Sequence, residues 1–361
     1  MSIVLHIGLH KTATKYFQHH VFPLLDDEKF IYNPPKLDQL LLDYLKAEED
    51  DKKEILEYLF LEYKKLATLN PNKTILLSRE AMSGNLFSAY KYWDYSVELL
   101  KKAFPNAKII IFLRNQIDWL VSCYRESVHE HHYQSIDKFL SFDKRCNSFK
   151  SPERSRNCEG FACLDALSLD YSKMIKKLFN SFGEDNVNVL FLENFKKDSA
   201  KTTKKLLAIL GSAKVEPIAT KGIPNRGYSA LSIELSIRRY ELAIEHGLEN
   251  LIHRPIFFYG EQSIPAGNMS LSILNKSKYW SDYYLRDNEE VRSANYPERS
   301  SSEQKEYEAS WRYIVKNILD KSTYADWDML DGMRSILHDH YRTINEPLKS
   351  LLKESYIPEE Y

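Results

Sequence analysis

The residues with the clearest chemical potential stand near the start of the chain, in the run Gly-Leu-His-Lys-Thr-Ala-Thr-Lys at positions 8–15. A short β-branched segment precedes this run and a helical pattern follows it. The first turn of a helix offers unpaired N–H groups and a partial positive charge, which together bind phosphate. Lys11 and the hydroxyls of Thr12 and Thr14 add further donors. We therefore expect the 8–15 loop to be a phosphate-binding loop.

The 8–15 loop departs from a Walker A motif at two positions. Ala13 stands where that motif has its second glycine, and Tyr16 stands where a Ser or Thr would ligate Mg²⁺. A P-loop kinase built on this sequence would lack its metal ligand. The alternative interpretation is an ordinary strand-to-helix turn with a solvated Lys11.

A second candidate site combines Arg114, at the end of an apolar strand pattern, with Ser122, eight residues later in the following helix. Two helical turns place the serine on the inward face, where it can converge with the arginine on one anion. The planar guanidinium fork suits phosphate. The alternative is an arginine that caps a neighbouring helix and a serine that is merely packed.

Two side chains are candidates for a general base. Glu80 follows a strand pattern at 73–78, and ligands of doubly wound sheets bind at the carboxyl ends of strands. His10 lies in the 8–15 loop and is the rival, while a salt bridge or a helix cap is the structural alternative for Glu80. The run His-Glu-His-His at 129–132 trails a helix, and we expect it to be a solvated cluster with no metal.

These motifs resemble those of PAPS-dependent sulfotransferases, where PAPS is 3′-phosphoadenosine-5′-phosphosulfate. The 8–15 loop is similar to the 5′-phosphosulfate loop, usually Lys-Thr-Gly-Thr-Thr, with Ala13 and Lys15 as departures. Arg114 through Ser122 resembles the 3′-phosphate motif. Softer similarities occur at 189–195, at 225–229 and at 345–352.

The resemblance implies sulfuryl transfer from PAPS to an acceptor hydroxyl or amine, which releases 3′,5′-ADP and requires no metal. It implies catalytic roles for Lys11, Glu80 and His10. The residues that it implies for nucleotide binding are His10, Lys11, Thr12, Ala13, Thr14, Lys15, Tyr16, Arg114, Ser122, Asn225 and Arg226. A small molecule, and a carbohydrate in particular, is the acceptor class that the family suggests.

The elements that must position these residues alternate along the chain. Strands are predicted at 2–8, 73–78, 107–113 and 187–192, and helices at 12–21, 37–69, 90–104, 116–131, 164–182 and 229–244. This alternation predicts an α/β fold, a mostly parallel sheet with helices on both faces. We expect a single domain over 1–361, a polar surface excursion at 143–163, and an insertion or acceptor-recognition region at 247–330.

Composition excludes several other classes. The formal net charge of −1 gives no bulk attraction to nucleic acid or to an anionic membrane. No apolar run approaches the roughly 20 residues of a membrane span, and the opening residues lack signal-peptide features. Four cysteines without CxxC spacing predict reduced thiols and a cytoplasmic location. A small-molecule kinase and a non-catalytic nucleotide-binding protein remain the alternatives, and the oligomeric state is open.

Overall fold

A computed structural model describes residues 2–152, 157, 160–212, 227–247, 311–322, 324–352, 357–358 and 361. Its centre is a five-stranded sheet in the order β2-β3-β1-β4-β7, in which all four neighbouring pairs are parallel. The strands are β1 (Ser2–Ile7), β2 (Phe30–Tyr32), β3 (Thr74–Arg79), β4 (Lys108–Leu113) and β7 (Val187–Phe191). The predicted α/β class is confirmed.

The sheet is buried on both faces because its strands are apolar at nearly every position. Alternate residues of β1 enter two separate cores. Ile3, Leu5 and Ile7 belong to a large core, whereas Val4 belongs to a smaller one on the opposite face. This double burial explains why the strand patterns show continuous apolar runs rather than polar–apolar alternation.

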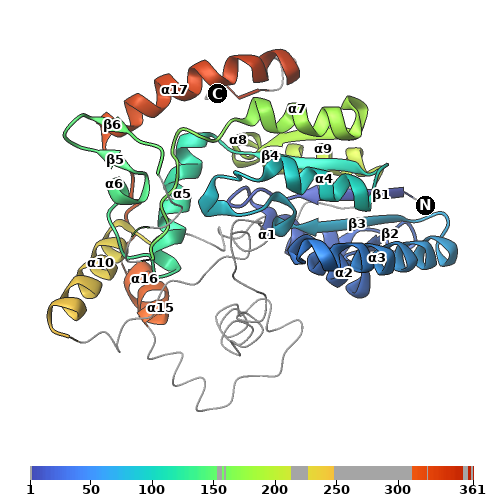
Figure 1. Ribbon diagram of the computed structural model, residues 1–361, viewed down its shortest axis with the longest axis horizontal. Helices are drawn as coiled ribbons and strands as arrows, with labels where there is room; N and C mark the ends of the chain where they lie inside the picture. The colour runs from blue at the N-terminus through green and yellow to red at the C-terminus, as the bar shows by residue number, and fades with distance from the viewer. Residues whose placement is uncertain are drawn as a thin grey trace.

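Helices cover both faces of the sheet. The large core receives side chains of α2 (Pro35–Lys46), α3 (Glu49–Leu69), α4 (Trp93–Ala103) and α7 (Tyr171–Phe182). The smaller core receives those of α1 (Thr14–His20) and α9 (Ser199–Leu210). Figure 1 shows α2 and α3 beside β3 at one end of the sheet and α7 at the other end. Short helical turns complete this part of the fold: η1 (Phe22–Leu24), η2 (Glu80–Ser83), η3 (Leu86–Ser88), η4 (Glu184–Asn186) and α8 (Leu192–Lys197).

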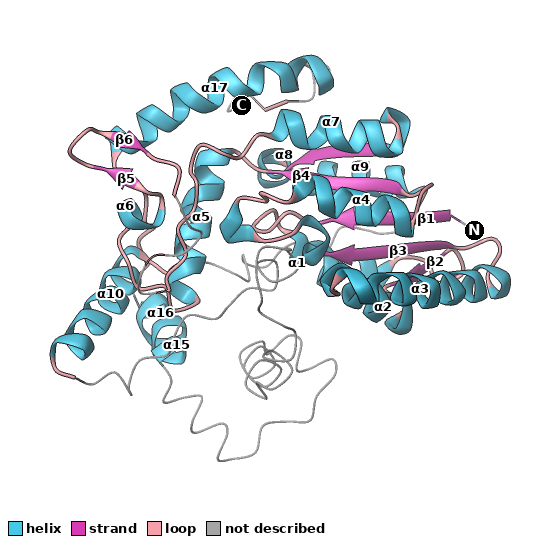
Figure 2. Ribbon diagram, in the orientation of Figure 1, coloured by secondary structure: helices cyan, strands magenta, loops and turns pink. Residues whose placement is uncertain are grey.

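The carboxyl ends of the strands point toward α5 (Gln116–His129), as the arrowheads in Figure 2 show. The long helix α17 (Asp331–Leu352) is tied to α5 by two buried hydrogen bonds between the amides of Gln116 and Asn345, at 2.7 and 3.1 Å. Both amides are thereby satisfied inside the core, where an unpaired polar group would be costly. The remaining described elements are α6 (Ile136–Phe139), β5 (Phe142–Asp143), β6 (Ser148–Phe149), α10 (Ala230–Glu245), α15 (Trp311–Ile314), η7 (Val315–Leu319) and α16 (Asp320–Ser322).

Several predicted boundaries need correction. The edge strand β2 was not predicted, because three residues are too few for a periodic pattern. The 37–69 stretch is two helices, since Ala47 takes an extended conformation between α2 and α3. The 143–163 excursion is only partly on the surface: β5 and β6 pair there, and Phe161 and Ala162 are buried. Residues 248–310 of the predicted insertion lie outside the described residues.

Among the helices that the structure describes, none combines the length and the apolar character needed to cross a membrane.

Candidate active site

The 8–15 loop joins β1 to α1 through a tight backbone path. A Cβ atom on Gly8 would lie 2.5 Å from the side chain of Thr14, so this position accepts only glycine without rearrangement. Lys11 and Ala13 both adopt left-handed conformations, with φ values of 66° and 64°. That conformation costs a non-glycine residue about 1 kcal/mol or more. Ala13 is therefore strained at a position where glycine would not be.

The two threonine hydroxyls of the loop point inward. Thr12 Oγ1 donates to the carbonyl of Leu9 at 2.6 Å, and Thr14 Oγ1 donates to the same carbonyl at 3.3 Å. Within the described part of the chain, the backbone N–H groups of Lys11, Thr12 and Ala13 have no hydrogen-bond acceptor. The loop therefore presents backbone donors to a ligand while its hydroxyls fix its shape.

Arg114 connects the second predicted motif to this loop. Its Nη1 donates to the carbonyl oxygen of Lys11 at 3.0 Å, and Trp119 donates to the carbonyl of His10 at 3.2 Å. The Nε atom of Arg114 is buried and has no hydrogen-bond partner. Ser122 lies two turns along α5 and is partly buried, and its hydroxyl makes no hydrogen bond to any described residue. The structure thus brings the loop and Arg114 together.

Glu80 and His10 lie close enough for their charges to interact. Glu80 follows β3 directly and begins η2, so its carboxylate stands at the carboxyl edge of the sheet. Burial lowers the pKa of His10, and the negative charge of Glu80 opposes that shift. The ring of His10 lies over Tyr90, with 6.1 Å between centroids, and its backbone N–H donates to the Tyr90 hydroxyl at 2.9 Å. A neutral His10 is a possible proton acceptor, as is Glu80.

Asp38 fixes the strand end that carries Glu80. The buried carboxylate of Asp38, on α2, accepts hydrogen bonds from Nε of Arg79 at 2.8 and 3.1 Å, and Nη2 of Arg79 is a further partner. Such a bidentate pair holds both side chains in one geometry. Arg79 is thus held by Asp38, immediately before Glu80 in the chain.

Lys11 has a partner that was not predicted. Its Nζ lies 3.0 Å from Oε2 of Glu126 on α5, and the two side chains are only about one quarter exposed, at 26% and 27%. Burial is the largest single influence and opposes the charged carboxylate. The positive charges of Lys11 and two further lysines, with the hydrogen bond from Lys11, together outweigh it and lower the pKa of Glu126 to about 2. The signal in the sequence was available, because Glu126 follows Ser122 by one helical turn and so shares its face.

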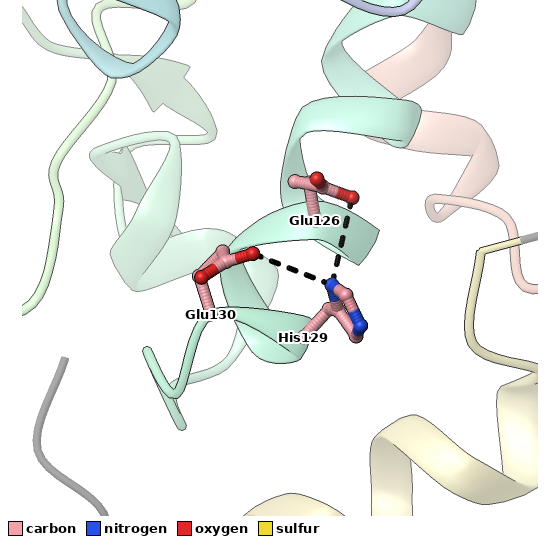
Figure 3. Close-up of side chains that lie close together, drawn as sticks. All are labelled: Glu126, His129 and Glu130. Atoms are coloured by element: carbon pink, nitrogen blue, oxygen red, sulfur yellow. Dashed lines mark ion pairs between the residues drawn. The ribbon is translucent and has the colours of Figure 1, made fainter. Parts of the chain in front are cut away.

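Glu126 belongs to a cluster with His129 and Glu130, shown in Figure 3. Nδ1 of His129 lies 3.9 Å from Glu126 Oε2 and 3.5 Å from Glu130 Oε1. The expectation of a solvated cluster was wrong, because all four residues from His129 to His132 are buried. Side chains from other parts of the fold pack against them. The ring centroid of Tyr228, for example, lies 5.1 Å from that of His129. The three side chains are close enough to hold a cation, but Glu126 already has Lys11 as its cation.

Asn225 and Arg226 lie outside the described residues, but the next residue is anchored beside the site. Nη2 of Arg125 and the hydroxyl of Tyr324 both donate to the carbonyl of Gly227, at 2.9 and 3.0 Å. A Cβ atom on Gly227 would lie 2.7 Å from Nε of Arg125, so the backbone approaches the arginine closely. The segment that follows residue 226 thus contacts α5 next to Glu126.

A family model described as the sulfotransferase domain matches residues 40–222, just over half of the chain. The chain belongs to the sulfotransferase family. The matched segment of this sulfotransferase contains Glu80, Arg114, Ser122 and Glu126, and it begins after the 8–15 loop.

Two solved structures resemble this sulfotransferase distantly. A sulfotransferase from Alicyclobacillus acidocaldarius is 18% identical, with 71% of this chain and 97% of that chain covered and a TM-score of 0.39. The mouse sulfotransferase SULT7A1 complexed with PAP is 14% identical, with 86% and 89% covered and a TM-score of 0.31. Both lie below the similarity at which a neighbour's ligand informs this enzyme. No curated protein matches the chain.

Proposed function

We propose that this sulfotransferase uses PAPS as its donor, transfers the sulfuryl group to a hydroxyl or amine of a small-molecule or carbohydrate acceptor, and releases 3′,5′-ADP. The observation that carries the proposal is the 3.0 Å hydrogen bond from Arg114 to the carbonyl of Lys11. This contact puts a guanidinium fork with a buried, unpartnered Nε next to a loop with free backbone donors. A donor with a 3′-phosphate and a 5′-phosphosulfate would use both.

In this proposal each residue has a distinct role. The backbone N–H groups of the 8–15 loop and Lys11 bind the 5′-phosphosulfate and stabilise the negative charge that develops on the leaving oxygen. Arg114 and Ser122 bind the 3′-phosphate. Glu80 takes the proton of the acceptor, and His10 is the alternative base.

The residues of the loop favour this donor over ATP with Mg²⁺. A phosphoryl-transfer loop needs a Ser or Thr at position 16 to ligate the metal. Here Tyr16 occupies that position, and its ring packs against Phe195 with 5.0 Å between centroids. The proposed in-line transfer on sulfur requires no metal ligand from the protein.

Two further parts of the proposal concern organisation. We propose that the chain is a single domain, because α17 and α10 pack on α5 of the same fold. We also propose that the 247–330 region contributes to acceptor recognition, since it follows α10, which contacts α5. Asn225 and Arg226 are proposed to close over the nucleotide.

The proposal is tested by incubating the enzyme with PAPS and a panel of hydroxyl and amine acceptors in EDTA. Release of 3′,5′-ADP and a sulfated acceptor, detected by mass spectrometry, are the expected products. Lys11→Ala should remove this activity. Lys173→Ala is the matched control, because Lys173 is exposed and, among the described residues, forms an ion pair only with Asp170, the N-cap of α7. The proposal would be contradicted if the enzyme consumed ATP with Mg²⁺ and consumed PAPS with none of the acceptors in the panel.

A further inference from the structure

The ammonium group of Lys11, which is proposed to bind the donor, already has an anionic partner. Lys11 Nζ and Glu126 Oε2 lie 3.0 Å apart, and α5 carries Glu126 one turn beyond Ser122. The 8–15 loop and Ser122 are both proposed to contact the donor. The carboxylate therefore stands at the place where a negatively charged phosphosulfate would bind.

The surroundings keep this carboxylate charged. Lys11 and Lys15 are positive groups on the loop and the start of α1, and Lys316 is a further positive group on η7. His129 at the end of α5 and Glu130, its C-cap, lie beside it (Figure 3). With this set of neighbours, Glu126 is an anion at neutral pH and attracts Lys11.

A lysine that binds a carboxylate and a phosphosulfate at once would bring two anions together. At a partly buried position their repulsion is weakly screened. The entering donor therefore has to draw Lys11 away from Glu126, and departure of the nucleotide product allows the ion pair to form again. The cost of this exchange lowers the affinity for both nucleotides.

We propose that Glu126 is a positioning residue that holds Lys11 while the site is empty and releases Lys11 to the donor when the donor binds. This inference rests on the proposed function, since it requires that the 8–15 loop bind the 5′ anion of the nucleotide. Glu126 then has two effects: it keeps Lys11 at the site between turnovers, and it promotes release of 3′,5′-ADP by recapturing Lys11.

The test is the affinity for 3′,5′-ADP, measured by calorimetry on the full chain. Glu126→Gln keeps the shape of the side chain but removes its charge, so it should bind the nucleotide about tenfold more tightly. Product inhibition of turnover by 3′,5′-ADP should strengthen by the same factor. Glu126→Asp keeps the charge on a shorter side chain and should give an intermediate affinity, which also decides the question if Glu126→Gln does not fold.

The matched control is Glu130→Gln, which removes a charge from the same cluster but not the partner of Lys11. Its affinity for 3′,5′-ADP should stay within about twofold of the wild type. Equal tightening in Glu130→Gln would show general repulsion and overturn the exchange. Unchanged or weaker binding by Glu126→Gln, in an enzyme whose wild type binds 3′,5′-ADP, would overturn this inference alone. Absence of binding by the wild type would instead overturn the proposed function.

Discussion

Replacement of Lys11 by alanine should separate the catalytic role of this residue from its structural one. Two effects are expected, because Lys11 faces both the proposed donor site and Glu126. Loss of one preorganised charge-stabilising group costs about 3–4 kcal/mol in the transition state. Turnover should therefore fall by about 100-fold or more.

The structural effect follows from the ion pair. A fully exposed pair contributes about 0–1 kcal/mol, whereas removal of one partner from a fully buried pair costs about 3–5 kcal/mol. The Lys11 and Glu126 side chains are 26% and 27% exposed, so we expect Lys11→Ala to lower the free energy of unfolding by about 1–2 kcal/mol. Glu126→Gln in the same chain removes the unpaired charge and should restore most of that loss.

Urea unfolding followed by circular dichroism measures the free energy of unfolding, and sulfuryl transfer from PAPS measures turnover. The double variant should recover stability but not turnover. The reasoning fails if Lys11→Ala keeps more than about a tenth of wild-type turnover, or if Glu126→Gln rescues turnover as well as stability.

Three other predictions test separate parts of the structure. Glu80→Gln should lower kcat strongly and leave the affinity for 3′,5′-ADP nearly unchanged; if neither quantity changes, His10 is the better candidate for the base. Ala13→Gly should raise the free energy of unfolding by up to about 1 kcal/mol in urea titrations, because it relieves the left-handed strain at φ 64°, and lower stability would refute that strain. Burial lowers the pKa of His6 to about 3, from 6.5 in an unfolded chain, so the unfolded state binds one more proton between these values. His6 should therefore make stability fall by about 1.4 kcal/mol per pH unit as the pH drops from 6.5 toward 3, with no effect above 6.5, and His6→Asn should remove that slope.

The sheet was predictable because its strands carry strong local signals. Central parallel strands must be apolar on both faces, and β1 and β4 show this as continuous runs. The strand β2 has only three residues and belongs to the sheet by pairing with β3. Three residues show no sequence pattern from which that pairing could be predicted. The break between α2 and α3 was likewise invisible to helical periodicity, since leucine and charged residues continue across it.

The parts of the candidate site that could be predicted are those that directly follow a strand of the sheet. The 8–15 loop, Arg114 and Glu80 follow strands whose carboxyl ends share one edge of a parallel sheet, so their proximity follows from topology. The pairing of Lys11 with Glu126 joins residues far apart in sequence and depends on how α5 packs over the loop. Burial of His129 through His132 was missed for the same reason, because polar residues at a helix end appear exposed until the covering chain is known.

The most direct test of the account is the discrimination between 3′,5′-ADP and 5′-AMP, which differ by the 3′-phosphate alone. Calorimetry in EDTA should show 3′,5′-ADP binding about a hundredfold more tightly, since Arg114 and Ser122 contribute charge-assisted hydrogen bonds of about 1.5–3 kcal/mol each. Arg114→Ala should remove most of this preference by weakening 3′,5′-ADP and leaving 5′-AMP unchanged. Equal affinities in the wild-type enzyme, or Mg²⁺-dependent binding of ATP that is tighter than that of 3′,5′-ADP, would contradict PAPS as the donor.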